Sequence, residues 1–200
     1  DLSADYRLKD PAAFEEWYTV PHQQPELLKE AVYGLPEIHR EAITSARLVA
    51  NPGCYSTSII LALAPLITED WVDCSCIVAD SKSGISGAGR QTSLTTQFSE
   101  AHEGVSAYKI ASHRHTPEIE QELSALANTD VKISFSPHLV PMTRGILSTV
   151  YINLMKDMSV EDLIEHFQKF YNGEPFVRVL PLGKYASTNF TAVSNFCDIG

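Results

Sequence analysis

One cysteine stands where a helix is expected to begin, a position that favours nucleophilic chemistry. Asn51-Pro52-Gly53-Cys54 forms a Pro-Gly turn, and a run of small and apolar residues follows from Ser56 to Leu66. The free N–H groups of a helix N-terminus stabilise an anion. This placement can lower the pKa of a cysteine from about 8.5 into roughly the 3.5–7.5 range. The sequence therefore predicts that Cys54 is a nucleophile carrying an activated thiol.

A histidine-rich stretch offers the cysteine a proton-transfer partner. His115 stands just before Thr116, which is expected to cap a helix over residues 117–127 with Pro117 at its first position. Glu118 follows His115 by three residues and could hold its imidazole in one tautomer, which would complete a nucleophile, base and orienting carboxylate. The alternative is that His113 and His115 are solvated loop residues. The nucleophile motif upstream favours the catalytic interpretation.

Basic and glycine-rich segments accompany these motifs. Arginines around a nucleophile suggest an anionic substrate, although each one alone is more often a surface charge. The loop from Ser83 to Gly89 could let its backbone approach a phosphate or a cofactor ring closely. It matches neither the dinucleotide fingerprint nor the P-loop, and as a bare motif it is more often a structural turn. The basic residues within or beside the motifs are Arg7, Lys82, Arg90, Lys109, Arg114 and Arg144.

Composition excludes several classes of function. The 200 residues carry a formal net charge of −10, which argues against a general nucleic-acid binder. The longest apolar run, Ile59 to Ile67, is broken by Pro65 and is too short to span a bilayer. The start of the chain has no secretory pattern, and the four cysteines are expected to be reduced, so a cytoplasmic location is predicted. No paired C-x2–4-C ligands occur, and no metal is expected.

Hydrophobic patterning predicts an α+β (α/β) fold with a mixed, largely antiparallel sheet covered by helices. The first forty-five residues are expected to be irregular, apart from short helices at 12–18 and 25–31. A helix over 159–171 is expected to start with a capping box of Ser159 and Asp162. Strands are predicted over residues 47–50, 76–81, 131–135, 147–154, 176–180 and 194–199.

Five stretches, in order along the chain, resemble the N-acetyl-γ-glutamyl-phosphate reductase family. The resemblance implies that Cys54 is the covalent nucleophile, that His115 is the acid/base and that Glu118 supports it. It also implies that Ser86 and Gly87 lie near the nicotinamide, and that Arg7, Arg114 and Arg144 contact the substrate anion. The stretches are Asp1–Arg7, Asn51–Thr57, Lys82–Arg90, His113–Ile119 and Pro137–Gly145.

The same resemblance implies a fold and an activity. The fold would be like the catalytic domain of glyceraldehyde-3-phosphate and aspartate-semialdehyde dehydrogenases. Residues 1–200 would be a catalytic and dimerisation domain of a homo-oligomer, a dimer or tetramer. Residues 1–46 would connect it to an N-terminal domain, outside this sequence, that binds most of the NADP. The reaction would reduce a small anionic acyl phosphate to an aldehyde, through a thioester on the cysteine, in arginine biosynthesis.

Three other interpretations remain open from the sequence. An enzyme like aspartate-semialdehyde dehydrogenase would use the same chemistry. A cysteine acyl hydrolase or transferase would use Cys54 and His115 without a cofactor. A non-enzymatic assembly domain would have an unreactive Cys54.

Overall fold

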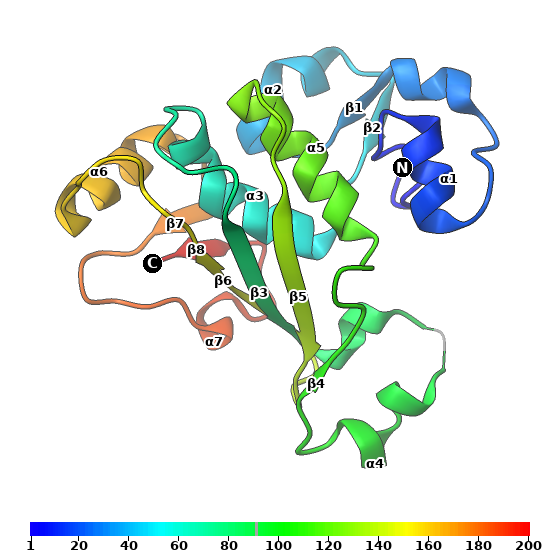
Figure 1. Ribbon diagram of the computed structural model, residues 1–200. Coiled ribbons are helices and arrows are strands. Elements are labelled where there is room, and N and C mark those ends of the chain that lie inside the picture. The colour runs from blue at the N-terminus through cyan, green and yellow to red at the C-terminus, as the bar shows by residue number, and fades with distance from the viewer. Residues whose placement is uncertain (91) are drawn as a thin grey trace.

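A four-stranded mixed sheet forms the centre of the protein in a computed structural model, which describes residues 1–90 and 92–200 (Figure 1). Its strands are β3 (Ile77–Ser83), β4 (Ser106–Ala107), β5 (Ile133–Leu139) and β6 (Ile146–Tyr151). They lie in the order β4-β5-β3-β6. β3 and β5 are parallel, whereas β6 pairs with β3, and β4 with β5, in the antiparallel sense. The predicted class, a mixed sheet with helices, is confirmed.

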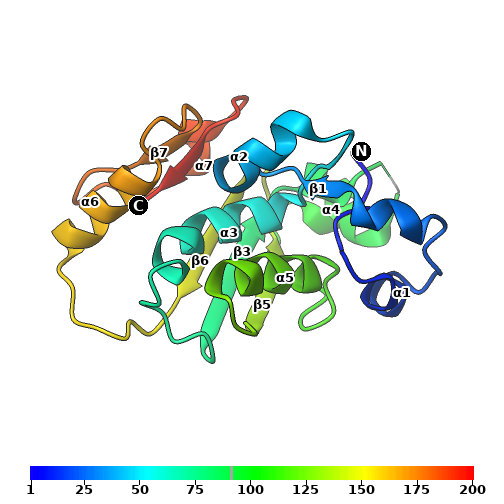
Figure 2. The same cartoon turned by 90° about the horizontal axis from the view of Figure 1, so that it is seen from above.

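Two helices cover one face of this sheet and form the core with it. They are α3 (Cys54–Ile67) and α5 (His115–Ala127), which run side by side (Figure 2). Alternate side chains of β3 are buried, which is the period-2 pattern of a strand with one covered face. Ile59 of α3 and Leu123 of α5 are fully buried in the same cluster. The core therefore fixes the N-terminal ends of both helices relative to each other.

The long helix α3 contains a proline close to its end, and the fold compensates for it. Pro65 has no N–H, so the carbonyl of Leu61 lacks its usual helical donor. The hydroxyl of Tyr171, a residue that is 4% exposed, donates to this carbonyl at 2.6 Å. An uncompensated buried carbonyl would cost free energy, so the Tyr171 hydroxyl stabilises the helix across the proline.

The N-terminal segment contains more regular structure than the sequence suggested. It holds α1 (Pro11–Tyr18), a 3-10 helix η1 (Pro25–Lys29), β1 (Ala31–Tyr33), α2 (Pro36–Ser45) and β2 (Leu48–Ala50). β1 and β2 are parallel and are connected through α2. The short helices expected at 12–18 and 25–31 are confirmed as α1 and η1. The expectation that the rest of the segment is irregular was wrong, because Pro36 was interpreted as a break. Instead, Pro11, Pro25 and Pro36 each stand at the start of a helix, where a missing N–H costs little.

The C-terminal segment packs beside the sheet on the other side of α3 from α5 (Figure 2). It consists of α6 (Val160–Phe170), β7 (Val177–Val179), α7 (Thr188–Thr191) and β8 (Cys197–Ile199), with β7 and β8 parallel. The predicted capping box is confirmed, since Ser159 and Asp162 bond reciprocally at the start of α6. The remaining short elements are η2 (Ile85–Ala88), η3 (Leu94–Thr96) and α4 (Phe98–Ala101). None of the helices in the described residues is both long and apolar enough to cross a bilayer.

Replacing Tyr171 by Phe should destabilise the protein, because the Leu61 carbonyl would stay buried without a donor. We expect a loss of about 1–3 kcal/mol in the free energy of unfolding, measured by urea denaturation. The same change in a Pro65→Ala background should cost less, since alanine at this position would supply the missing N–H. Tyr151→Phe, at an exposed position, is the control and should shift stability by no more than about 0.5 kcal/mol. Equal losses in both backgrounds would contradict this account.

Candidate active site

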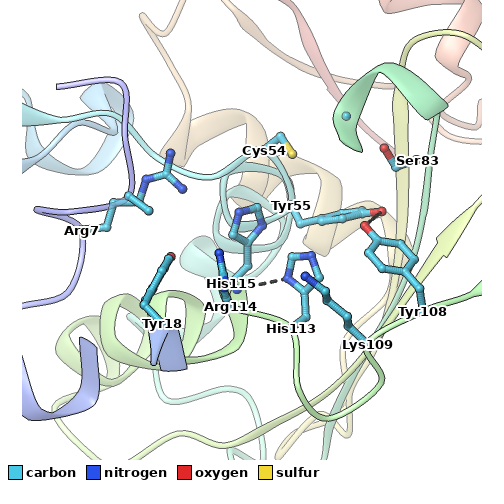
Figure 3. Close-up of a pocket in the computed structure, with 12 residues that line it drawn as sticks. Arg7, Tyr18, Cys54, Tyr55, Ser83, Tyr108, Lys109, His113, Arg114 and His115 are labelled. Atoms are coloured by element: carbon cyan, nitrogen blue, oxygen red, sulfur yellow. Dashed lines mark hydrogen bonds between the residues drawn. The ribbon is translucent and has the colours of Figure 1, made fainter. Parts of the chain in front are cut away.

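The N-terminal ends of α3 and α5 open into a pocket of about 240 Å³. Segments far apart in the sequence line it: the first residues of the chain, the start of α3, the end of β3 and the loop before α5 (Figure 3). Two helix N-termini directed at one cavity favour the binding of an anion. The lining residues are Ala4, Arg7, Tyr18, Cys54, Tyr55, Ser83, Gly87, Tyr108, Lys109, His113, Arg114 and His115.

Cys54 is the first residue of α3 and keeps solvent-exposed surface at the pocket. The partial burial of its sulfur raises the pKa of the thiol, and the backbone N–H groups of Tyr55 and Cys54, which bond to the sulfur, act in the opposite direction. The predicted lowering of this pKa is therefore wrong. The helix N-terminus contributes with the expected sign, but burial outweighs it. The thiol is protonated at neutral pH and needs a base when it reacts.

His115 lines the same pocket and stands at the start of α5. The predicted cap at Thr116 is wrong, because the helix begins at His115 and the Thr116 hydroxyl is buried without a partner among the described residues. The imidazole lies against the turn before Cys54, so closely that a methyl group added to Gly53 would overlap its Nε2. Burial, with smaller effects of His113 and Arg7, lowers the pKa of His115 to about 3. The ring is neutral and can accept a proton.

His113 supports His115 through the backbone. Its Nδ1 accepts a hydrogen bond from the main-chain N–H of His115 at 3.1 Å (Figure 3). The rings of Tyr55, Tyr108 and Phe135 contact it edge-on. Burial, with smaller effects of Lys109 and Arg114, lowers the pKa of His113 to about 4. A solvated loop histidine is thus excluded, and His113 shapes the wall of the pocket.

Glu118 lies behind the pocket and is only 1% exposed. Its Oε1 accepts hydrogen bonds from the Gly53 N–H and from the Tyr33 hydroxyl, each at 2.7 Å. Its Oε2 is 3.6 Å from a guanidinium nitrogen of Arg7. Burial raises the pKa of Glu118 against the opposing effect of Arg7. The expectation that Glu118 holds His115 is wrong, since Nδ1 of His115 has no hydrogen-bond partner among the described residues.

Of the three predicted arginines, the structure brings two to the pocket. The Arg7 Nε donates to the Asn51 carbonyl at 2.7 Å, which ties the arginine to residues 51–53, the turn before the predicted nucleophile (the nucleophile turn). Arg114 is exposed and lies over the ring of Tyr18 at 4.9 Å. Arg144 is exposed in the turn between β5 and β6 and does not line the pocket. Its backbone is packed against Gly84 instead, where an added Cβ would come within 2.8 Å.

The two predicted cofactor contacts lie on η2, at the end of β3. Gly87 lines the pocket, whereas Ser86 is exposed and is not one of the lining residues. The main-chain N–H of Ser86 donates to the Thr143 carbonyl at 3.0 Å, so the β5–β6 turn holds this helix in place. The glycine loop is therefore a fixed wall of the pocket, and a Cβ added at Gly87 would come within 2.8 Å of the Ser83 hydroxyl.

A tyrosine pair forms a part of the site that sequence reasoning missed. The Tyr108 hydroxyl donates to the Tyr55 hydroxyl at 3.0 Å, and both rings line the pocket beside Ser83 (Figure 3). Tyr55 directly follows Cys54, the predicted nucleophile, and this position in the sequence was an available signal. Tyr108 and Tyr18 carried none, because only the fold brings their segments to the pocket.

Comparison with known proteins identifies relatives of this chain. The family described as "Semialdehyde dehydrogenase, dimerisation domain" matches residues 54–200. N-acetyl-gamma-glutamyl-phosphate reductase of Geobacter metallireducens is 58% identical over 201 residues, which cover 100% of this chain and 58% of that protein. The chain thus spans 58% of the length of the curated relatives it matches.

Solved structures with little sequence identity share the fold. Aspartate semialdehyde dehydrogenase II from Vibrio cholerae superposes with a TM-score of 0.62 at 14% identity, over 80% of this chain and 54% of that one. Aspartate semialdehyde dehydrogenase with NADP from Candida albicans gives a TM-score of 0.56 at 12% identity, over 81% and 54% of the two chains. This likeness confirms the predicted fold type.

Acidification below pH 6.5 should destabilise the protein through its two pocket histidines. Their folded-state pKa values lie near 4 and 3, below the ordinary value, so the stability they contribute is complete above pH 6.5 and is lost as the pH falls. Each histidine should lower the free energy of unfolding by up to about 1.4 kcal/mol per pH unit between pH 6 and 5. Urea denaturation of His113→Asn should show a shallower pH slope. His102→Asn, at an exposed position, should keep the slope, and an unchanged slope in His113→Asn would contradict the assignment.

Gly53→Ala should be destabilising because of His115 alone. Gly53 has an extended backbone conformation that any residue adopts, but its added methyl group would overlap the His115 ring. We expect a loss of about 1–3 kcal/mol in thermal or urea unfolding, as in other overpacked sites. In a His115→Ala background the same change should cost less than about 1 kcal/mol. A full loss in both backgrounds would mean that the backbone, and not the imidazole, requires glycine.

Proposed function

Because this chain belongs to the semialdehyde dehydrogenase dimerisation-domain family, we propose that it is the catalytic and dimerisation part of an NADP-dependent oxidoreductase. The substrate would be N-acetyl-γ-glutamyl phosphate and the product N-acetylglutamate 5-semialdehyde, a step of arginine biosynthesis. The observation that carries this proposal is a cysteine at a helix N-terminus, in one pocket with a neutral histidine and three cationic side chains. The relatives named for this reaction support the choice of substrate.

The first half of the reaction is acyl transfer to Cys54. The sulfur attacks the acyl carbonyl, the bond to phosphate breaks, and phosphate leaves a thioester behind. His115 accepts the thiol proton as the bond forms, because both groups are neutral before reaction. The N–H groups of Cys54 and Tyr55 at the start of α3 are suited to stabilise the negative charge that develops on the carbonyl oxygen.

The second half requires a hydride, which bound NADPH would supply to the thioester carbon. The carbon–sulfur bond then breaks to release the aldehyde, and His115 returns its proton to the departing sulfur. Gly87 fits a position beside the nicotinamide, because it borders the pocket and has no side chain. A Cβ added there would overlap the Ser83 hydroxyl, at 2.8 Å. We assign Ser86, which precedes Gly87 on η2, to the same region. Most NADP contacts would come from a nucleotide-binding domain outside these 200 residues.

The charges of the pocket suit an acyl phosphate. Arg7, Lys109 and Arg114 line it, in a chain whose net charge is −10. We propose that Arg114 and Lys109, which are exposed, contact the phosphate or carboxylate of the substrate, with Arg7 closer to the sulfur. The position of Arg144 outside the pocket gives no support for its predicted role.

The family supports a proposal for assembly, and the cysteines support a proposal for location. The matched region is described as a dimerisation domain, so self-association is expected, and we propose a homodimer or tetramer. The four cysteines of the described residues are free thiols, which supports a reducing, cytoplasmic location. Neither a nucleic acid nor a membrane is proposed as a partner.

Covalent labelling would test the proposal at its first step. Incubation with N-acetyl-γ-glutamyl phosphate should add one acyl group to the chain, mapped to Cys54 by peptide mass spectrometry. Cys54→Ala should lose the label completely, whereas Cys76→Ala, which removes another exposed cysteine, should keep it. With NADPH the chain alone should turn over little aldehyde. The absence of any acyl-enzyme would refute the proposal, and continuous NADPH-independent hydrolysis would favour a cysteine hydrolase.

A further inference from the structure

The turn that carries Cys54 is held by a cluster of Glu118, Tyr33 and Arg7, of which only Arg7 lines the pocket. Glu118 accepts the Gly53 N–H, and Arg7 donates to the Asn51 carbonyl, so the two sides of the turn are bound by two side chains that also contact each other. Tyr33, which is 5% exposed, donates its hydroxyl to the same Glu118 oxygen that Gly53 uses. The cluster thus joins the N-terminal loop, β1, α5 and the nucleophile turn.

We infer that Glu118 and Tyr33 are positioning residues, which hold the Gly53 N–H and thereby set the place of Cys54 and of the first N–H groups of α3. The inference rests on the proposed function in one respect only, namely that Cys54 undergoes acyl transfer. Neither side chain lines the pocket, so neither contacts a substrate there.

The geometry explains why one oxygen of Glu118 would set the position of the Cys54 sulfur. Gly53 is the cap of α3, and its carbonyl accepts both the N–H and the hydroxyl of Thr57 at 2.9 and 3.0 Å. With the carbonyl fixed to the helix, the N–H of Gly53 is the remaining main-chain group that sets how the turn enters it. Glu118 holds this N–H at 2.7 Å, in a buried environment where hydrogen bonds to a charged group are strong.

The charge of Glu118 acts against the reactivity of the thiol. Its negative charge raises the pKa of Cys54, and the positive charge of Arg7 partly offsets this effect. A residue selected for activation of the thiol would have the opposite sign. The carboxylate is therefore useful at this position because its side chain is long enough to reach the Gly53 N–H and because one oxygen accepts from both Gly53 and Tyr33. Arg7 provides the counter-charge.

Two variants of Glu118 separate the effect of side-chain length from the effect of charge. Glu118→Gln keeps an oxygen at the same distance but removes the charge, whereas Glu118→Asp keeps the charge and withdraws the oxygen from Gly53. The probe is p-nitrophenyl acetate, whose acetyl group would pass to the Cys54 sulfur with release of p-nitrophenolate, while the thiol proton passes to His115 or buffer. The burst of p-nitrophenolate is compared with the pH profile of Cys54 alkylation by iodoacetamide, mapped by peptide mass spectrometry.

At equal thiolate fraction, we expect Glu118→Asp to acylate at least about 10-fold more slowly than the parent, because a misplacement of even 1 Å is costly. Glu118→Gln should stay within about 3-fold of the parent rate. Its alkylation profile should move to lower pH, because the adverse charge is gone. The opposite order, a slow Gln variant and a fast Asp variant, would overturn the inference, and so would equal rates in both.

Tyr33 is tested by a double-mutant cycle. Tyr33→Phe should slow acylation by about 3-fold or more in the parent and should have no further effect in Glu118→Asp, because it acts through the same oxygen. Additive effects would show that Tyr33 acts independently and would refute its part of the inference. Thermal unfolding of each variant identifies any that fail to fold. If Glu118→Asp does not fold, the Tyr33→Phe cycle is run with Glu118→Gln, which keeps the oxygen; Tyr33→Phe should then slow acylation as much as it does in the parent, and a lost effect refutes the inference.

Glu122 provides a matched control on the same helix. It lies one turn further along α5, is 2% exposed and is bonded to His39 at 2.8 Å. Glu122→Gln and Glu122→Asp should leave both acylation and the alkylation profile unchanged. A parent protein that is never acylated would instead reject the proposed function, so the two failures are distinguishable.

Discussion

The buried carboxylate of Glu118 is the interaction on which the site depends. A carboxylate at 1% exposure is costly unless donors surround it, and here a main-chain N–H, a phenol and a guanidinium approach it. These donors come from three segments that are far apart in the sequence. The requirement to satisfy one buried charge therefore fixes the N-terminal loop, β1 and the nucleophile turn against the start of α5.

Close packing at this point also determines the protonation states of the reacting groups. The His115 ring needs the bare backbone of Gly53, and the crowding that results makes both the thiol and the imidazole neutral. A preformed thiolate–imidazolium pair would need more solvent or a counter-charge on His115. In the proposed reaction the proton would therefore be transferred during the attack, when the acyl group would replace water above the sulfur. Burial and catalysis are compatible because the N–H groups of α3 provide stabilisation at that moment.

Local patterns in the sequence were sufficient to predict some elements of the structure and insufficient to predict others. The box of Ser159 and Asp162 begins α6 as predicted, since both partners lie within one helical turn. The partners of Glu118 could not be predicted, because Gly53 and Tyr33 lie 65 and 85 residues away from it in the sequence. The predicted direction of the Cys54 pKa shift was wrong for the same reason, because a helix N-terminus is a local feature, whereas burial is a product of the whole fold.

Electrostatics on a larger scale favour the same pocket. In a chain with net charge −10, an anion would be repelled from most of the surface, but Lys109 and Arg114 stand exposed at the mouth of the pocket. Arg7 lies deeper, with its side chain 11% exposed, where its charge is less screened by water and salt. An anion thus meets increasing attraction as it approaches Cys54. Because Glu118 offsets part of the charge of Arg7, the deepest cation holds the turn in place and attracts an anion less strongly than an unpaired guanidinium would.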